Sequence, residues 1–167
     1  RPQSRKDRFC CGEFRVKSKP RLVIFGDARK DHVAEAKKVF LEFCAQKAEI
    51  IADCLVTDCE NVDFSNTDFA VVLGGDGSIL AAARTLSQVQ IPIVGVNLGK
   101  LGYLAEFSLD EVKKNWDRIF DAKLIEPRMM LLAEIAHDSG THLATTAVND
   151  VVINAGPPFR MIELQIC

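Results

Sequence analysis

A glycine-rich turn at residues 74–77 is the stretch of this sequence whose residue types and spacing most clearly suggest chemistry. Gly-Gly-Asp-Gly directly follows the apolar run "DFAVVL" (68–73). Glycines let backbone N–H groups approach anionic oxygens, and a helix that begins just after the turn adds a favourable partial charge. The turn is therefore a candidate phosphate-binding element.

Asp76 is the residue of this turn that phosphate binding does not explain, because a carboxylate beside phosphates is repelled unless it has a task. It could hold Mg²⁺, or accept the proton of a hydroxyl that attacks a phosphoryl group. The competing interpretation is that Asp76 caps the helix that follows. Ser78 is also available as a cap, which weakens the capping interpretation without removing it.

A second glycine cluster, "GVNLGKLGYL" (95–104), follows another apolar run. Neither cluster is a GxGxxG dinucleotide fingerprint, and the sequence has no GxxxxGK[ST] P-loop. If the protein binds phosphate, it therefore does so with a structural motif other than these two. In an open parallel sheet, ligands bind outside the carboxyl ends of the strands, and we expect both clusters to lie there.

The elements that must position these turns alternate between strand and helix patterns. Apolar runs predict strands at 21–27, 68–75 and 91–97, and a short strand followed by a loop at 49–56. Amphipathic spacing predicts helices over 31–47, with Asp31 as N-cap, over 78–89 and over 109–122. This alternation predicts a parallel sheet with right-handed crossovers, and hence a Rossmann-like, three-layer α/β domain.

The pattern changes after about residue 125, where turns are short and helices are absent. The segments "RMMLLAEIAH", "HLATTAVNDVVINAG" and "RMIELQI" predict strand after strand, as at the beginning of an antiparallel, β-rich second domain. We therefore expect a basic, mobile arm at 1–20, an α/β nucleotide-binding domain at 21–125, and the first strands of a truncated β-rich domain at 126–167.

Composition argues against several classes of partner. With 21 Lys and Arg against 23 Asp and Glu, the net charge of −2 predicts no nucleic-acid partner. No apolar run approaches the roughly 18 residues of a membrane span, so no membrane partner is expected. The six cysteines contain no CxxC pair. They are interpreted as reduced thiols of a cytoplasmic protein, although a regulatory disulfide of Cys10 is an alternative.

Three motifs in order, "LGGDGSIL", "GVNLGKLGYLAEF" and "VNDVVINAG", resemble those of the NAD kinase family over residues 20–167. GGDG is shared with diacylglycerol, sphingosine and phosphofructokinase-type kinases, whereas the second motif is more specific. The resemblance implies ATP-dependent phosphorylation of the adenosine ribose 2′-hydroxyl of NAD to give NADP. It also implies Mg²⁺ or another divalent cation, nucleotides as partners, and a homo-oligomeric full-length protein.

The resemblance further implies a role for each matching residue. Asp76 is the catalytic residue that activates or orients the ribose hydroxyl; no metal ligand is assigned. The nucleotide-binding residues implied are Gly74, Gly75, Gly77, Tyr103, Asn149, Asp150 and Arg160. Tyr103 stands where the family usually has Phe and is otherwise a core aromatic. Asn149 and Asp150 are otherwise ordinary turn residues, and Arg160 a solvated strand residue.

The sequence also departs from the family pattern. Ser78 replaces the commoner Thr, and Ala81 stands where some members have a basic residue. The family's later GSTAY-like segment is not in the sequence, and we expect the 167-residue piece alone to be inactive. Two alternatives remain: the catalytic domain of a lipid kinase, which the second motif disfavours, and a non-catalytic nucleotide-binding module.

Overall fold

A computed structural model of the chain describes residues 19–59, 61–99, 102–121, 124–136, 140, 142–157, 161 and 163. The chain divides into two compact units, Arg1–Pro127 and Arg128–Cys167, which are considered separately below. None of the helices in these described ranges is long and apolar enough to cross a membrane.

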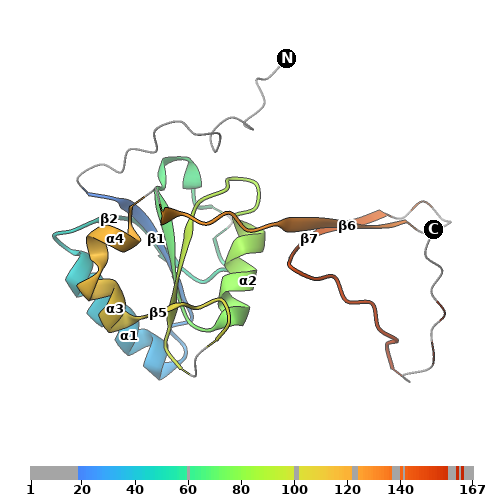
Figure 1. The fold of residues 1–167 in the computed structure, drawn as a ribbon, viewed down its shortest axis with the longest axis horizontal. Helices are drawn as coiled ribbons and strands as arrows, with labels where there is room; N and C mark the ends of the chain where they lie inside the picture. Colours follow the sequence, from blue (N-terminus) through green and yellow to red (C-terminus); the bar gives the residue numbers. More distant parts are fainter. Residues whose placement is uncertain are drawn as a thin grey trace, which may run out of the picture. The chain divides into compact units, whose positions relative to one another are not determined.

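The first unit is built on a five-stranded parallel sheet with the order β2-β1-β3-β4-β5 (Figure 1). The strands are β1 (Arg21–Gly26), β2 (Glu49–Cys54), β3 (Phe69–Leu73), β4 (Ile93–Asn97) and β5 (Phe107–Ser108). All five residues of β3 are buried, as in a strand covered on both faces. From β1, the chain first adds β2 on one side, then returns to add β3 on the other side of β1, and continues outward to β4. The order in which strands are added thus reverses between β1 and β3, and open α/β sheets bind ligands at such a reversal.

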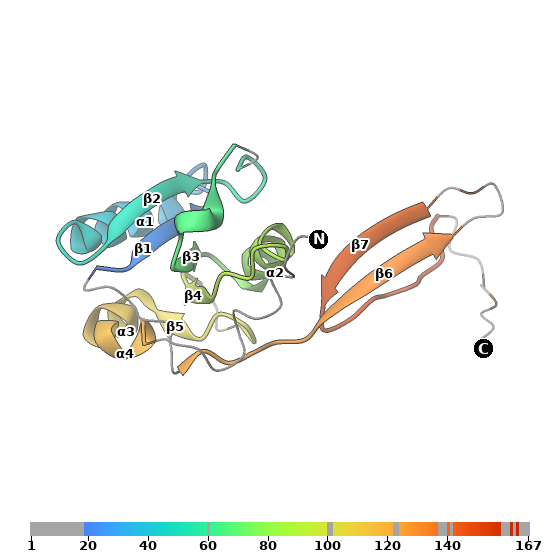
Figure 2. The same cartoon turned by 90° about the horizontal axis from the view of Figure 1, so that it is seen from above.

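Helices cover both faces of this sheet (Figures 1 and 2). On one face lie α1 (Asp31–Cys44), α3 (Leu109–Lys114) and α4 (Trp116–Ile119), and on the other lies α2 (Asp76–Thr85). Alternate residues of each strand point to opposite faces. Accordingly, Leu22 and Ile24 of β1 belong to one buried cluster, and Val23 and Phe25 to the other. The Rossmann-like α/β prediction is therefore confirmed.

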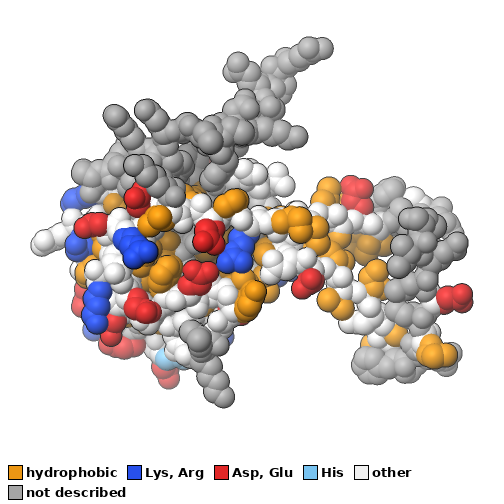
Figure 3. Space-filling model, viewed as in Figure 1, with side chains coloured by type: hydrophobic (Ala, Val, Ile, Leu, Met, Phe, Trp, Pro, Cys, Tyr) orange, Lys and Arg blue, Asp and Glu red, His pale blue; other side chains and the backbone are white. Residues whose placement is uncertain are grey.

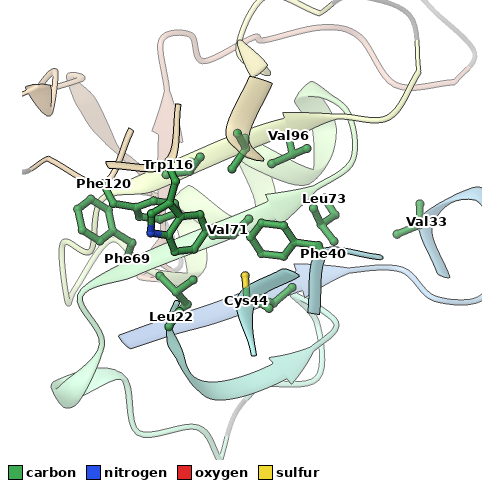
Figure 4. Close-up of a cluster of buried hydrophobic side chains, with 14 residues drawn as sticks. Leu22, Val33, Phe40, Cys44, Phe69, Val71, Leu73, Val96, Trp116 and Phe120 are labelled. Carbon is green, nitrogen blue, oxygen red and sulfur yellow. The ribbon is translucent and has the colours of Figure 1, made fainter. Parts of the chain in front are cut away.

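Aromatic rings fill much of the first cluster (Figure 4). The Trp116 ring lies 4.3 Å from that of Phe120 and 5.4 Å from that of Phe43, between ring centroids. Phe120 in turn meets the Phe69 ring edge-on at 5.2 Å. Buried aromatic side chains contribute large apolar areas, so these contacts fix α1 and α4 against the same face of the sheet.

The second unit begins with an antiparallel hairpin. Strand β6 (Met130–Ala136) pairs with β7 (His142–Val148), in register from Met130 with Val148 to Ala136 with His142. Two of the predicted antiparallel strands are thus confirmed. Residues 151–157 contain no strand, so that part of the prediction is wrong. Most of the third predicted strand, 160–166, lies outside the described residues.

Several boundaries also differ from prediction. The predicted helix 109–122 is interrupted at Asn115, whose φ of −112° and ψ of 26° are not helical. The short strand β5 and the 3₁₀ turn Phe64–Asn66 were not predicted. Asp31 is the first residue of α1 and not its N-cap, which is Lys30. An acidic residue in the first turn still interacts favourably with the helix dipole.

Charges of both signs are interspersed on the surface of the first unit (Figure 3). Basic and acidic side chains alternate across the face that the figure shows, without a continuous basic stripe among its described residues. Nucleic-acid binding surfaces usually carry such a stripe. The face shown therefore lacks that electrostatic signature.

Candidate functional site

The Gly-Gly-Asp-Gly turn connects the end of β3 to the start of α2. Gly74 N–H donates to the Val96 carbonyl at 3.0 Å, which ties the turn to β4. Gly75 is the N-cap, in extended backbone, and no side chain caps the helix. The suggestions that Asp76 or Ser78 caps α2 are therefore wrong. Ser78 is already inside the helix, and its N–H donates to the Gly75 carbonyl at 3.0 Å.

The glycines of the turn differ in what surrounds them. A Cβ at Gly74 would lie 2.7 Å from the Ser78 hydroxyl oxygen, so a side chain there collides with the helix. A Cβ at Gly75 or Gly77 would meet nothing within 4 Å. The backbone at Gly75 and Gly77 thus faces open space from which a ligand can approach it.

The Asp76 carboxylate joins this turn to the second glycine-rich segment. Tyr103 N–H donates to Oδ2 at 2.8 Å, Leu104 N–H to Oδ1 at 2.9 Å, and Ala105 N–H to Oδ1 at 3.2 Å. These bonds favour the charged form of the acid. The bond from Tyr103, followed by that from Leu104, lowers the pKa of Asp76 below its ordinary value, and partial burial opposes them only in part.

Gly102 makes this contact possible. A Cβ on residue 102 would lie 2.8 Å from the Asp76 carboxyl carbon, closer than real Cβ atoms approach their neighbours, and a tight 3.1 Å from Oδ2. Sequence reasoning did not identify Gly102 as a site residue. The available signal was a glycine immediately before the aromatic residue of the second motif.

The chemistry open to Asp76 follows from its ionisation. A carboxylate whose pKa is lowered is charged at neutral pH and is a weak proton acceptor. It is suited to orient a hydroxyl by accepting its hydrogen bond, or to bind a cation. Among the described residues, no group of three or more His, Cys, Asp or Glu side chains could hold a metal ion. Mg²⁺ that is held mostly by substrate phosphates and water needs no such group.

Tyr103 lies beside Asp76 in the fold, and its side chain is 82% exposed. The alternative that Tyr103 is a core aromatic is therefore wrong. Its backbone holds the Asp76 carboxylate while its ring is open to the surroundings. Gly74, Gly75, Asp76, Gly77 and Tyr103 are thus brought together at the carboxyl edge of the sheet, as expected.

Asn149 and Asp150 lie in the second unit, directly after β7, and both are exposed. Asn149 has a φ of 67°, in the left-handed region that Asn tolerates better than most residues. Asp150 N–H donates to the Val148 carbonyl at 2.9 Å, which closes a three-residue turn. Their role in nucleotide binding stays a prediction, and Arg160 lies outside the described residues.

A cleft of about 370 Å³ lies at the carboxyl ends of β1 and β2, and sequence reasoning missed it. It is lined by Gly26, Ala28, Arg29, Lys37, Asp53, Cys54 and Leu55. Its cations are paired: Lys37 Nζ lies 2.5 Å from Asp53, and Arg29 Nε lies 2.7 Å from Asp27. The hydrogen bond from Arg29 lowers the pKa of Asp27 to about 2. The polar "GDARKD" that follows β1 was the signal in the sequence.

Cys44 and Cys54 are poor candidates for a nucleophile. Cys44, Cys54 and Cys59 are thiols rather than disulfides, as predicted. Burial raises the pKa of Cys44 to about 12 and is the largest cause that raises the pKa of Cys54 to about 11. Thiols with such pKa values are protonated at neutral pH and react slowly.

Comparison with known proteins gives one family. The family model of the ATP-NAD kinase N-terminal domain matches residues 13–124. An NAD kinase from Azoarcus sp. (strain BH72) is 41% identical over 116 residues, covering 69% of this chain and 39% of the relative. An NAD kinase from Rhodopirellula baltica is 33% identical over 151 residues, covering 88% of this chain and 47% of the relative.

A solved structure agrees with this result at the level of the fold. The crystal structure of yeast NADH kinase complexed with NADH superposes with a TM-score of 0.60 and 20% sequence identity. The match covers 78% of this chain and 47% of the yeast chain. The chain thus spans less than half the length of these relatives.

Proposed function

The chain belongs to the NAD kinase family, and from that premise we propose an activity for the full-length protein that carries it. That protein transfers the γ-phosphoryl group of ATP to the 2′-hydroxyl of the adenosine ribose of NAD, giving NADP and ADP. The family assignment rests on a model match that covers residues 13–124.

The observation that carries this proposal is the Asp76 carboxylate, held by three backbone N–H groups beside an open glycine turn. Phosphoryl transfer depends mainly on positioning the reactants and on stabilising charge. An ionised, immobilised carboxylate can accept the hydrogen bond of the ribose hydroxyl and hold its oxygen in line with the donor phosphate. Gly74, Gly75 and Gly77 would place the backbone of the turn against phosphate oxygens.

Mg²⁺, or another divalent cation, belongs to the same proposal. It would neutralise charge on the transferred phosphoryl group. The described residues offer no cluster of three acidic or other metal-binding side chains. The cation would therefore be held mainly by donor phosphates and water.

The remaining predicted contacts lie on both units. Tyr103, whose exposed ring adjoins Asp76, would stack against the dinucleotide, and Asn149, Asp150 and Arg160 would bind its polar groups. The thiols of Cys44, Cys54 and Cys59 support a reducing compartment, and we propose a cytoplasmic homo-oligomer.

An acceptor panel tests the activity. The purified full-length protein is incubated with ATP and Mg²⁺ together with NAD, NADH, diacylglycerol or sphingosine, and phosphorylated products are separated and quantified. We expect NADP to form from NAD. Phosphorylation of a lipid acceptor without NADP would contradict the proposal, and no transfer to any acceptor would support a non-catalytic module. The 167-residue chain alone is expected to be inactive, because it spans less than half of its relatives.

A further inference from the structure

We propose that Gly102 is a positioning residue for Asp76. Because it lacks a side chain, residues 103–105 can hold the Asp76 carboxylate in one orientation that leaves Oδ2 to meet the acceptor hydroxyl. The catalytic part of this inference rests on the proposed function, whereas its structural part does not.

The assignment of Oδ2 follows from a count of hydrogen-bond acceptor positions. An ionised carboxylate offers about two positions on each oxygen. Among the described residues, Leu104 and Ala105 donate to Oδ1, and Tyr103 alone donates to Oδ2. Within the contacts of the described residues, Oδ2 is therefore the oxygen that keeps an acceptor position for a substrate hydroxyl.

The need for glycine at residue 102 is steric and not conformational. The φ of Gly102 lies outside the left-handed region, so its backbone conformation is open to alanine. The obstacle is the carboxylate itself, whose carbon would lie 2.8 Å from the new Cβ. A Cβ added at Gly99, in the same segment, would meet nothing within 4 Å. Gly99→Ala is thus a matched control for the steric effect.

Relief of this overlap must separate the carboxylate from residues 103–105. The side chain of Asp76 can rotate, or the segment can shift, and either movement lengthens the bonds that fix the carboxylate. Loss of N–H donors to the charged form moves the pKa of a carboxyl back towards its ordinary value. Gly102→Ala therefore has a measurable effect on Asp76 that does not depend on turnover.

The first test follows the Asp76 side-chain carboxyl by ¹³C NMR in a pH titration of the full 167-residue chain. The wild type and Gly99→Ala should titrate below the ordinary aspartate range, and Gly102→Ala should titrate at a higher pH. An unchanged titration midpoint in Gly102→Ala would overturn the proposal.

A double-mutant cycle covers the case in which Gly102→Ala does not fold. Asp76→Ala removes the group that residue 102 would strike, so Gly102→Ala should lower Tm much less in the Asp76→Ala background than in the wild type. If Gly102→Ala alone does not fold but the double variant with Asp76→Ala does, the two residues are coupled even more strongly than the difference in Tm would show. Equal decreases in Tm in both backgrounds would show that the two residues are not coupled.

The catalytic part is tested in the full-length protein by NADP formation. Misplacement of a reacting group by about 1 Å can cost about 10²-fold in rate, so Gly102→Ala should lower kcat by about 10-fold to 10²-fold. An unchanged kcat with a shifted Asp76 titration would overturn the catalytic part alone. If the wild type makes no NADP while the titration and the cycle behave as expected, the proposed function fails and the structural coupling stands.

Discussion

At Asp76, one carboxylate performs two tasks that compete for its oxygens. It holds residues 103–105 by their backbone N–H groups, and in the proposed function it also accepts a bond from the substrate. Asparagine is usually a mild replacement for aspartate in turns. At residue 76 the replacement is not mild, because both carboxylate oxygens accept from backbone N–H groups. The NH₂ of an asparagine side chain would place a donor opposite one of these donors. Asp76→Asn is therefore expected to weaken the contact between the two glycine-rich segments.

This effect on stability should depend on pH. The folded-state pKa of Asp76 is lowered from 3.8, so its ionised form stabilises the fold fully above that value. The contribution is lost as the pH falls through the lower folded-state pKa. We expect wild type to melt above Asp76→Asn at pH 7, and the difference in Tm to shrink on acidification below about pH 4. Melting curves of both proteins, recorded by circular dichroism at several pH values, measure this difference in Tm. A difference that does not change with pH would rule out stabilisation by the ionised carboxylate.

At the scale of elements, the central strands and α1 could be predicted because uninterrupted apolar runs and an amphipathic stripe are strong local signals. The two-residue strand β5 carries no such signal, and the amphipathic pattern continues through the interruption at Asn115 without marking it. The contact of Asp76 with Tyr103, Leu104 and Ala105 spans 27 to 29 residues. No periodicity encodes such a contact. It emerges only when the parallel pairing of β3 and β4 brings their carboxyl ends to one edge.

The end of β7 provides the prediction at this scale. Asn149 combines a positive φ with an exposed side chain, and unusual backbone conformations concentrate at functional sites. Asn149→Gly removes the side chain but keeps the conformation, whereas Asn149→Ala also introduces left-handed strain of roughly 1–2 kcal/mol. In the full-length enzyme, Asn149→Gly should raise the KM for NAD more than the KM for ATP, with little change in Tm.

Asn149→Ala should show the same increase in KM together with a lower Tm. If Asn149→Gly leaves both KM values unchanged while Asn149→Ala lowers Tm, Asn149 is an ordinary turn residue. Steady-state kinetics with each substrate varied in turn, together with melting curves of both variants, separate these cases.

At the scale of the whole molecule, the two units differ in how much buried core supports each of them. The first unit has a buried core on each face of its sheet, and its fold class could be predicted from the sequence. In the second unit, large apolar side chains of the hairpin remain exposed, among them Leu132, Ile135 and Leu143. An isolated two-stranded hairpin is at best marginally stable. The sequence predicted the two strands, but the course of residues 151–157 was not predictable from their apolar pattern alone.

In the proposed function, phosphorylation of NAD depends on the carboxylate of Asp76. The most direct measurement is kcat for NADP formation by the full-length protein and its Asp76→Asn variant, with Tm and NAD affinity determined on the same preparations. We predict a folded variant that still binds NAD and whose kcat is lower by about 10²-fold or more, because the ribose hydroxyl is no longer held in line for attack. A variant with near-wild-type kcat would contradict this claim, because Asp76 would then serve only to hold residues 103–105.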